Sequence, residues 1–227
     1  LAVSLALSVL SACAFSYGVS EQSNAPLSMA VLTELANAAS TPGLTIQATP
    51  EVQTELNSWR SDPKAHQYLQ QSLQRMKQYQ GDIEKSLAQR NMPVALLAVP
   101  LAESGFQALP EKANPVRAAG VWQFIPETAV HYGLNVGAKN DERFDMHRST
   151  QAALNLLQDD YRIFNNWKLA VIAYEMGEQG TMHLIRTTGS RDPWVLARSP
   201  FAPRSLKKVL SMFEAGAIVI HDPQSLG

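Results

Sequence analysis

One carboxyl group lies at the end of an apolar run, where its negative charge would be unfavourable. The run LLAVPLAESGFQALP at residues 96–110 carries a single acid, Glu103, directly before Ser104. A carboxyl group in such a setting must find a partner, reach water or keep its proton. A carboxyl group that is still protonated near neutral pH can act as a general acid. Glu103 is therefore the first catalytic candidate, and a helix-end acid paired with an arginine such as Arg117 is the ordinary structural alternative.

Two further stretches follow Glu103 and Ser104 in the order of a known family. They are GVWQF at residues 120–124 and AYEMGE at residues 173–178, with PETAVHYGL and DERFD between them. In this order the stretches resemble the signature of family 1 lytic transglycosylases, bacterial enzymes that cleave peptidoglycan on a goose-lysozyme-like fold. The resemblance covers residues 51–227, and its two ends are similar to the membrane-bound type D branch.

The resemblance implies that Glu103 is the single catalytic acid and base. As an acid it would protonate the oxygen of the β-1,4 bond between N-acetylmuramic acid and N-acetylglucosamine. As a base it would take the proton of the muramyl C6 hydroxyl, which closes onto C1 to give a 1,6-anhydro sugar. This route needs neither a water molecule nor a second carboxylate as nucleophile.

The resemblance also implies a set of residues on the substrate side of the cleft. Ser104 would support the geometry of the acid, and Gln123 would contact the N-acetyl groups of the sugars. Tyr174 would lie against the acid and the cationic transition state. The aromatic neighbours Trp122 and Phe124 are more typical of core than of a sugar platform.

Glu175 departs from the family pattern, which usually has asparagine after the tyrosine. An amide that donates and accepts is replaced by a group that only accepts when it is ionised. Glu175 either stabilises the developing positive charge or repels the substrate and weakens activity. Two other functions therefore stay open beside the lytic enzyme: a hydrolytic muramidase on the same fold, and a glycan-binding or sensory module that has lost turnover.

The composition argues against several other classes of protein. The chain has 227 residues, with 19 Lys and Arg against 20 Asp and Glu and no run of like charge, so nucleic-acid binding is not indicated. The five histidines and the one cysteine show no metal-ligand spacing, and no glycine-rich phosphate loop is present. We expect no metal and no cofactor.

The N-terminal region predicts a membrane attachment followed by a tether. Residues 1–20 are uncharged and mostly apolar, which is typical of a targeting or anchor segment. Within them LSAC resembles a bacterial lipobox that would lipidate Cys13, and the end of a transmembrane helix is the alternative. Either anchor predicts a periplasmic, membrane-anchored protein. The chain starts with Leu, so we expect a fragment or a trimmed product. The composition of residues 21–50, with only a short helical pattern near MAVLTELA, predicts a tether.

The remaining residues, 51–227, predict a mainly α, lysozyme-like catalytic domain whose core motifs fall within 93–180. A helix over 62–90 is predicted by one apolar stripe, with Gly81 as a possible break. Its members are Leu69, Leu73, Met76, Ile83 and Leu87. A buried central helix should start at Pro93 and kink at Pro100.

Four more helices are predicted after the loop that follows the central helix. The first should run from Pro126 to Tyr132 and stop at Gly133. The second should begin near Asp145, and the third should be buried and end at Gly177. The tail supplies the last helix, and no alternation typical of strands occurs. The apolar face of the second of these helices should consist of Ala153, Leu156, Leu157 and Ile163.

Overall fold

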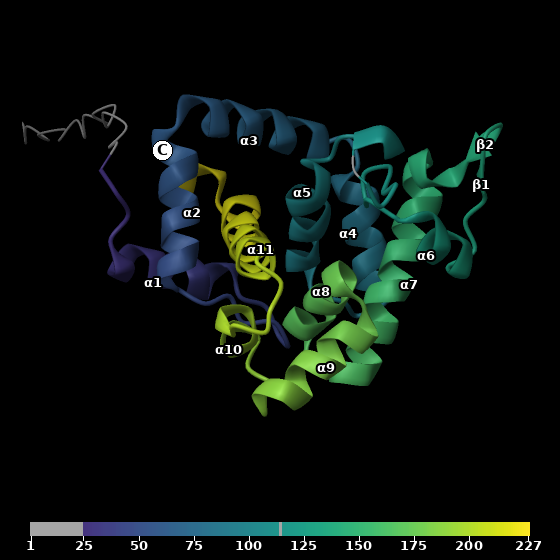
Figure 1. Ribbon diagram of the computed structural model, residues 1–227. Helices are drawn as coiled ribbons and strands as arrows, with labels where there is room; N and C mark the ends of the chain where they lie inside the picture. Colours follow the sequence, from purple (N-terminus) through teal and green to yellow (C-terminus); the bar gives the residue numbers. More distant parts are fainter. Residues whose placement is uncertain (1–24, 114) are drawn as a thin grey trace, which may run out of the picture.

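A computed structural model describes residues 25–113 and 115–227, and it is built almost entirely of helices (Figure 1). The predicted mainly α fold is therefore confirmed. The α-helices are α1 (Met29–Ala39), α2 (Pro50–Ser61), α3 (Pro63–Met76), α4 (Gln80–Gln89), α5 (Ala98–Ser104), α6 (Pro126–His131), α7 (Met146–Phe164), α8 (Trp167–Met176), α9 (Glu178–Thr188), α10 (Pro193–Arg198) and α11 (Leu206–His221). Short 3-10 turns cover Val94–Leu97, Glu111–Ala113, Glu142–Phe144 and Pro223–Leu226. Strands β1 (Val136–Gly137) and β2 (Asn140–Asp141) pair as a small antiparallel hairpin that the sequence did not predict.

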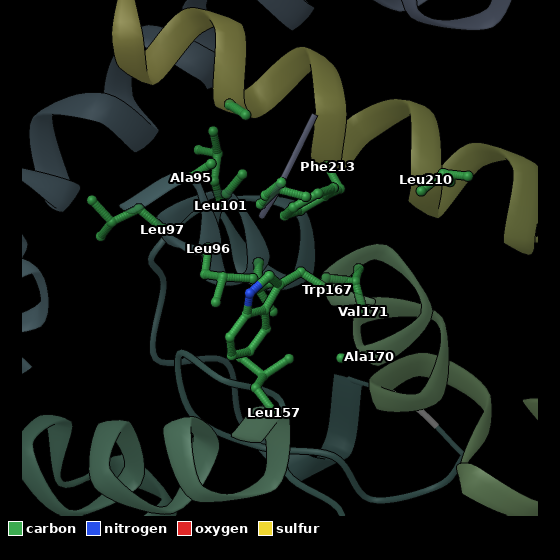
Figure 2. Packing of buried hydrophobic residues seen from close by; sticks show 14 of the residues in the cluster. Ala95, Leu96, Leu97, Leu101, Leu157, Trp167, Ala170, Val171, Leu210 and Phe213 are labelled. Atoms are coloured by element: carbon green, nitrogen blue, oxygen red, sulfur yellow. The ribbon is translucent and has the colours of Figure 1, made fainter. Parts of the chain in front are cut away.

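The C-terminal helix α11 is the element on which the others pack. It contacts α1, α2, α5, α8 and α10, and in Figure 1 it stands between α2 and α5. Gly216 lets α11 approach α5 closely, because an added Cβ would lie 3.2 Å from Leu101 Cδ2 and 3.4 Å from Ala98 Cβ. Figure 2 shows the resulting cluster, in which side chains of α5 and its preceding turn meet Trp167 of α8 and Phe213 of α11. The apolar face of α5 is thus covered by a helix from the far end of the chain.

The central helix is shorter than predicted and is not a single kinked helix. A 3-10 turn over Val94–Leu97 leads into α5, and Pro100 is the third residue of α5. Its missing N–H is therefore in the first turn, where no intrahelical partner exists. Gly105 ends the helix with φ 57°, and its N–H donates to Leu101 O. This left-handed cap fixes Glu103 in the last turn of α5.

Two other helix predictions need correction. The helix predicted over 62–90 is two helices, α3 and α4, which separate at residues 77–79, and Gly81 lies inside α4 rather than at the break. The whole predicted stripe is nevertheless buried. On α7 the prediction fails for Ile163, whose side chain is 41% exposed, because Phe164 turns into the core in its place.

The predicted tether over residues 21–50 is wrong for most of its length. Helix α1 packs against α2 and α11, and the turn that follows it continues into the core. Leu32, Ala36, Leu44 and Ile46 are all buried. These few apolar residues do not stand out in a segment rich in Ser, Thr, Ala and Pro. The fold nevertheless needs them, because they cover α11.

A buried carboxylate ties this N-terminal segment to three helices. Glu214 of α11 is 0% exposed and accepts hydrogen bonds from the backbone N–H of Gln47 at 2.6 Å, from Lys168 Nζ at 3.1 Å and from Trp194 Nε1 at 3.1 Å. Burial raises the pKa of Glu214, and the charge of Lys168 opposes that rise. The three donors offset much of the desolvation of the carboxylate, so removal of any one would leave it undersatisfied.

The membrane attachment predicted for residues 1–20, with Cys13 as the lipidated residue, lies outside the described residues. In the part of the chain that the structure describes, no helix is both long enough and apolar enough to span a bilayer.

The packing of α1 can be tested with one pair of substitutions. Leu32→Ala should lower the free energy of unfolding by about 2 to 5 kcal/mol, because it opens a cavity between α1 and α11. Val31→Ala on the same helix is the matched control, since Val31 is 43% exposed and should change stability little. Urea unfolding followed by circular dichroism measures both values. Equal stability of the two variants would mean that α1 is not part of the folded core.

Candidate active site

A cleft of about 930 Å³ opens beside the end of α5. Its walls come from α5, the loop before α6, α6 itself, α7, α8 and the start of α9. Four of the five predicted site residues line it: Glu103, Gln123, Tyr174 and Glu175. The fold therefore brings residues from three separate motifs to one place, whereas Ser104 lies behind the wall.

Glu103 has the environment of a general acid. Burial, followed by the nearby charge of Glu175, raises the pKa of Glu103 from 4.5 to about 8. The alternative in which Arg117 neutralises Glu103 is wrong, because Arg117 forms its ion pair with Glu111 at 3.3 Å. Within the described residues no ion pair to Glu103 occurs. The carboxyl group therefore keeps its proton near neutral pH.

Ser104 lies on the core side of the cleft wall and holds that wall in place. Its side chain is 2% exposed, and its Oγ lies 2.7 Å from Val121 O and 3.2 Å from Pro100 O, so the hydroxyl can donate to either carbonyl. The hydroxyl thus joins α5 to the loop that carries Gln123. The predicted support of the acid's geometry fits this position, but the predicted contact with substrate does not, because the side chain faces the core.

The loop carrying Gln123 has an unusual backbone. Arg117, Gly120 and Gln123 all have positive φ, with values of 60°, 79° and 50°. Gln123 Nε2 donates to Gly120 O at 2.6 Å, which folds the side chain back onto its own loop. A Cβ on Gly120 would lie 1.9 Å from Arg143 O, so only glycine fits. Such conformations persist only when the surroundings hold them in place.

Arg143 is the residue that holds this loop. Its side chain is fully buried and donates to Arg117 O at 2.7 Å and Phe124 O at 3.2 Å, one carbonyl near each end of the loop. Its charge is balanced by Asp141 at 2.6 Å and Glu111 at 3.0 Å. The DERFD stretch noted in the sequence therefore shapes the cleft wall, a role that the motif alone did not reveal.

Both aromatic residues of the loop are buried, as the sequence analysis favoured, and Phe124 also lines the cleft. Trp122 is buried, and its Nε1 donates to Thr150 Oγ1 at 3.0 Å. Phe124 is buried edge-on to Tyr174, with 6.2 Å between the ring centroids. Tyr174 in turn donates its hydroxyl to Trp122 O at 2.6 Å. These contacts fix the tyrosine ring as part of the cleft wall.

Tyr174 stays neutral although it lies among acids. Burial, then the charges of Glu103 and Asp160, raise its pKa well above the ordinary value. Glu175 follows it at the cleft edge and is exposed, and the hydroxyl of Ser205 donates to its Oε1 at 3.5 Å. Partial burial of its carboxyl group at the cleft edge raises the pKa of Glu175, and the hydrogen bond from Ser205 opposes that rise.

Sequence reasoning missed one buried acid in the cleft, Asp160 of α7. It is 4% exposed and lines the cleft, and no hydrogen bond reaches its Oδ2. Burial, then the charges of Glu178 and Asp159, raise its pKa to about 7. A signal was present in the sequence, because position 160 lies seven residues after Ala153 and four after Leu156, on the predicted apolar face of this helix.

Comparison with known proteins agrees with this architecture. The sequence model of the transglycosylase SLT domain family matches residues 78–197. Membrane-bound lytic murein transglycosylase D from two Escherichia coli strains is 35% identical over 150 residues, which are 64% of this chain and 33% of each relative. A putative tributyltin chloride resistance protein from an Alteromonas species is 31% identical over 129 residues, which are 56% of each chain.

The family match spans every residue of the cleft described above, from Glu103 to Glu178. The chain belongs to the transglycosylase SLT domain family, and the predicted lysozyme-like helical fold is thereby confirmed. The matched part amounts to about a third of the length of the Escherichia coli relatives.

The raised pKa of Glu103 predicts a pH-dependent loss of stability. The pKa of about 8 in the folded state exceeds the ordinary 4.5, so the folded state binds more protons than the unfolded state between these values. Stability should therefore fall as pH rises through this window, by at most about 1.4 kcal/mol per pH unit for one proton. Glu103→Gln removes this titration, so its melting temperature should exceed that of the wild type by a margin that grows from about pH 5 to about pH 8.

Thermal melts across this range measure the margin. Glu127→Gln, which removes an exposed acid on α6, is the control and should follow the wild type. A constant difference between Glu103→Gln and the wild type would mean that Glu103 titrates normally.

Proposed function

We propose that this protein is a peptidoglycan lytic transglycosylase with Glu103 as its single acid and base. The observation that carries the proposal is the carboxyl group of Glu103, which lines the cleft, has its pKa raised to about 8 by burial and lies within the stretch that the family model matches. The relatives named lytic murein transglycosylase support the reaction type. The substrate would be the β-1,4 bond between N-acetylmuramic acid and N-acetylglucosamine.

The proposed reaction needs one residue in two protonation states. Protonated Glu103 gives its proton to the glycosidic oxygen as the C1–O bond breaks and positive charge develops at the muramyl carbon. The resulting carboxylate takes the proton of the C6 hydroxyl while O6 bonds to C1. Glu103 is protonated again at the end, and the product is the 1,6-anhydro sugar.

The other cleft residues fit supporting roles in this proposal. Gln123 presents an amide that can hydrogen-bond an N-acetyl group, although its Nε2 is engaged with Gly120 O in the absence of substrate. Tyr174 offers the face of a fixed, neutral ring beside the acid, and the face of an aromatic ring attracts positive charge. Ser104 and Arg143 hold the walls that carry these groups.

We further propose a location in the bacterial envelope, facing peptidoglycan. Two relatives carry the description membrane-bound, and the apolar residues 1–20 would supply an anchor, either as a lipoprotein through Cys13 or as a transmembrane helix. Lipid analysis of Cys13→Ser would separate the two, because only the lipoprotein loses its acyl chains.

The catalytic proposal is tested with Glu103→Gln and purified sacculi. The amide keeps the shape of the side chain but cannot transfer a proton. Release of anhydro-muropeptides should therefore fall by about 10²- to 10⁴-fold, the typical contribution of general acid–base catalysis. Mass spectrometry identifies the product class, since the anhydro ends of a lytic enzyme are lighter by one water than the ends made by a hydrolytic muramidase. Unchanged release by the variant would overturn the role of Glu103, and sacculus binding without any release by the wild type would instead favour a glycan-binding module.

The pH dependence of the reaction tests the influence of Glu175. The general acid must be protonated, so activity should fall as pH rises through the pKa of about 8 of Glu103. Glu175→Asn removes one of the two causes of that raised pKa, and the alkaline limb of the kcat/KM profile should move to lower pH. Glu127→Gln removes another cleft carboxyl that is not among these causes, and it should leave the limb in place. Superimposable profiles of Glu175→Asn and the wild type would show that the two acids do not interact.

A further inference from the structure

Acidic side chains in the cleft far outnumber basic ones. Five carboxyl side chains line it, those of Glu103, Glu127, Asp160, Glu175 and Glu178. The one basic side chain among its lining residues is a histidine, and the described part of the chain brings no lysine or arginine to this wall. A cleft with this balance of charge favours a ligand that carries a positive group.

Asp160 is the acid that the proposed reaction does not use. It is 4% exposed, and its Oδ2 has no hydrogen-bond partner. An acceptor left unsatisfied in a buried setting is unfavourable, and a bound donor would remove that penalty. Because Asp160 also lines the cleft, a ligand there can supply the donor.

The groups that face Asp160 are acidic or neutral. Glu178, at the start of α9, exerts the larger charge effect on it, and Asp159 the smaller. Asp159 is engaged elsewhere, with Arg162 Nη1 at 2.5 Å and the hydroxyl of Tyr132 at 3.4 Å. The charge of Asp160 also acts on Tyr132 and Tyr174, and the pKa of each tyrosine is raised, so both rings are neutral. Among the described residues, therefore, no lysine or arginine forms an ion pair with Asp160 or Glu178.

This pair of acids lies away from the bond-breaking acid. The charges of Glu103 and Asp160 both act on Tyr174, and all three residues line the cleft. Glu103 itself is affected by the charge of Glu175 and not by that of Asp160. Asp160 is thus placed to hold a group of the bound glycan rather than to exchange protons with Glu103.

We propose that Asp160 and Glu178 form a binding site for a primary ammonium group of the substrate. An ammonium group is compact and has three donors, so it can reach both carboxylates at once. A metal ion is not supported, because within residues 25–113 and 115–227 no three metal-ligating side chains converge. The inference rests on the proposed function, since the ligand is the peptidoglycan strand. Its ammonium has two chemical sources: an amino sugar that lacks its acetyl group, or the side-chain amine of a diamino acid in the stem peptide.

The test is a binding measurement with ligands that cannot be cleaved. Glucosamine oligomers are compared with N-acetylglucosamine oligomers, and a disaccharide muropeptide with a free side-chain amine is compared with its N-acetylated form. Isothermal titration calorimetry near neutral pH on the full chain should show about tenfold or tighter binding of the amine in one of the two pairs. The pair that shows the preference identifies the source of the ammonium, and equal affinity in both pairs overturns the proposal.

Three variants assign the preference to the site. Asp160→Asn keeps the shape of the side chain and should abolish the preference for the amine, and Glu178→Gln should reduce it. Asp82→Asn removes an exposed acid of α4, outside the cleft, and should keep the full preference. A preference that survives both Asp160→Asn and Glu178→Gln overturns the site, and Glu178 is exposed, so its variant tests the proposal even if Asp160→Asn does not fold.

Release of anhydro-muropeptides from sacculi is measured on the same preparations. Release without any preference for the amine rejects the ammonium site alone. Absence of release together with absence of binding to every sugar ligand rejects the proposed function itself.

Discussion

The close packing of α5 against α11 is the constraint on which the active site depends. Gly216 lets the two helices approach closely, and the first four residues of α5, Ala98 to Leu101, are all buried. Glu103 sits in the last turn of this helix, so its surroundings are set by core packing rather than by a dedicated partner. The same packing that stabilises the fold thereby disfavours the ionised form of the carboxyl group, and a general acid results.

The opposite wall of the cleft is held through backbone carbonyls. Ser104 binds Val121 O, Tyr174 binds Trp122 O, and Arg143 binds Phe124 O, which are carbonyls of one short loop. Each of the three donors comes from a different element. The loop can therefore keep its positive φ values without regular secondary structure. We expect substitutions of these three donors to disturb the cleft wall.

Much of this arrangement could be predicted from the sequence, and the failures have identifiable causes. The motifs marked Glu103, Gln123, Tyr174 and Glu175 because their residue types and order are distinctive, and all four line one cleft. The tether prediction is wrong for α1 because its three buried residues, Leu32, Ala36 and Ala39, are diluted among small polar ones, which outweigh the short helical pattern near MAVLTELA. Asp160 was missed because periodicity was applied only to apolar residues, although an acid at a core position of a helix is the more informative observation. The role of Arg143 depends on contacts up to 32 residues away in the sequence, which no local pattern can reveal.

The part of the chain shared with the family and the part that folds as a unit have different limits. The family match ends at residue 197, yet α11 begins at Leu206 and covers α5, and the whole of α1, α2 and α3 precedes the start of the match. A recombinant fragment trimmed to the shared region would lose the helix that shields the catalytic one and would expose a broad apolar surface to water. The similarity to the family is thus concentrated around the cleft, whereas the flanking helices keep the apolar surface of α5 away from water. The sequences of the two parts could change independently as long as a surface complementary to α5 is preserved.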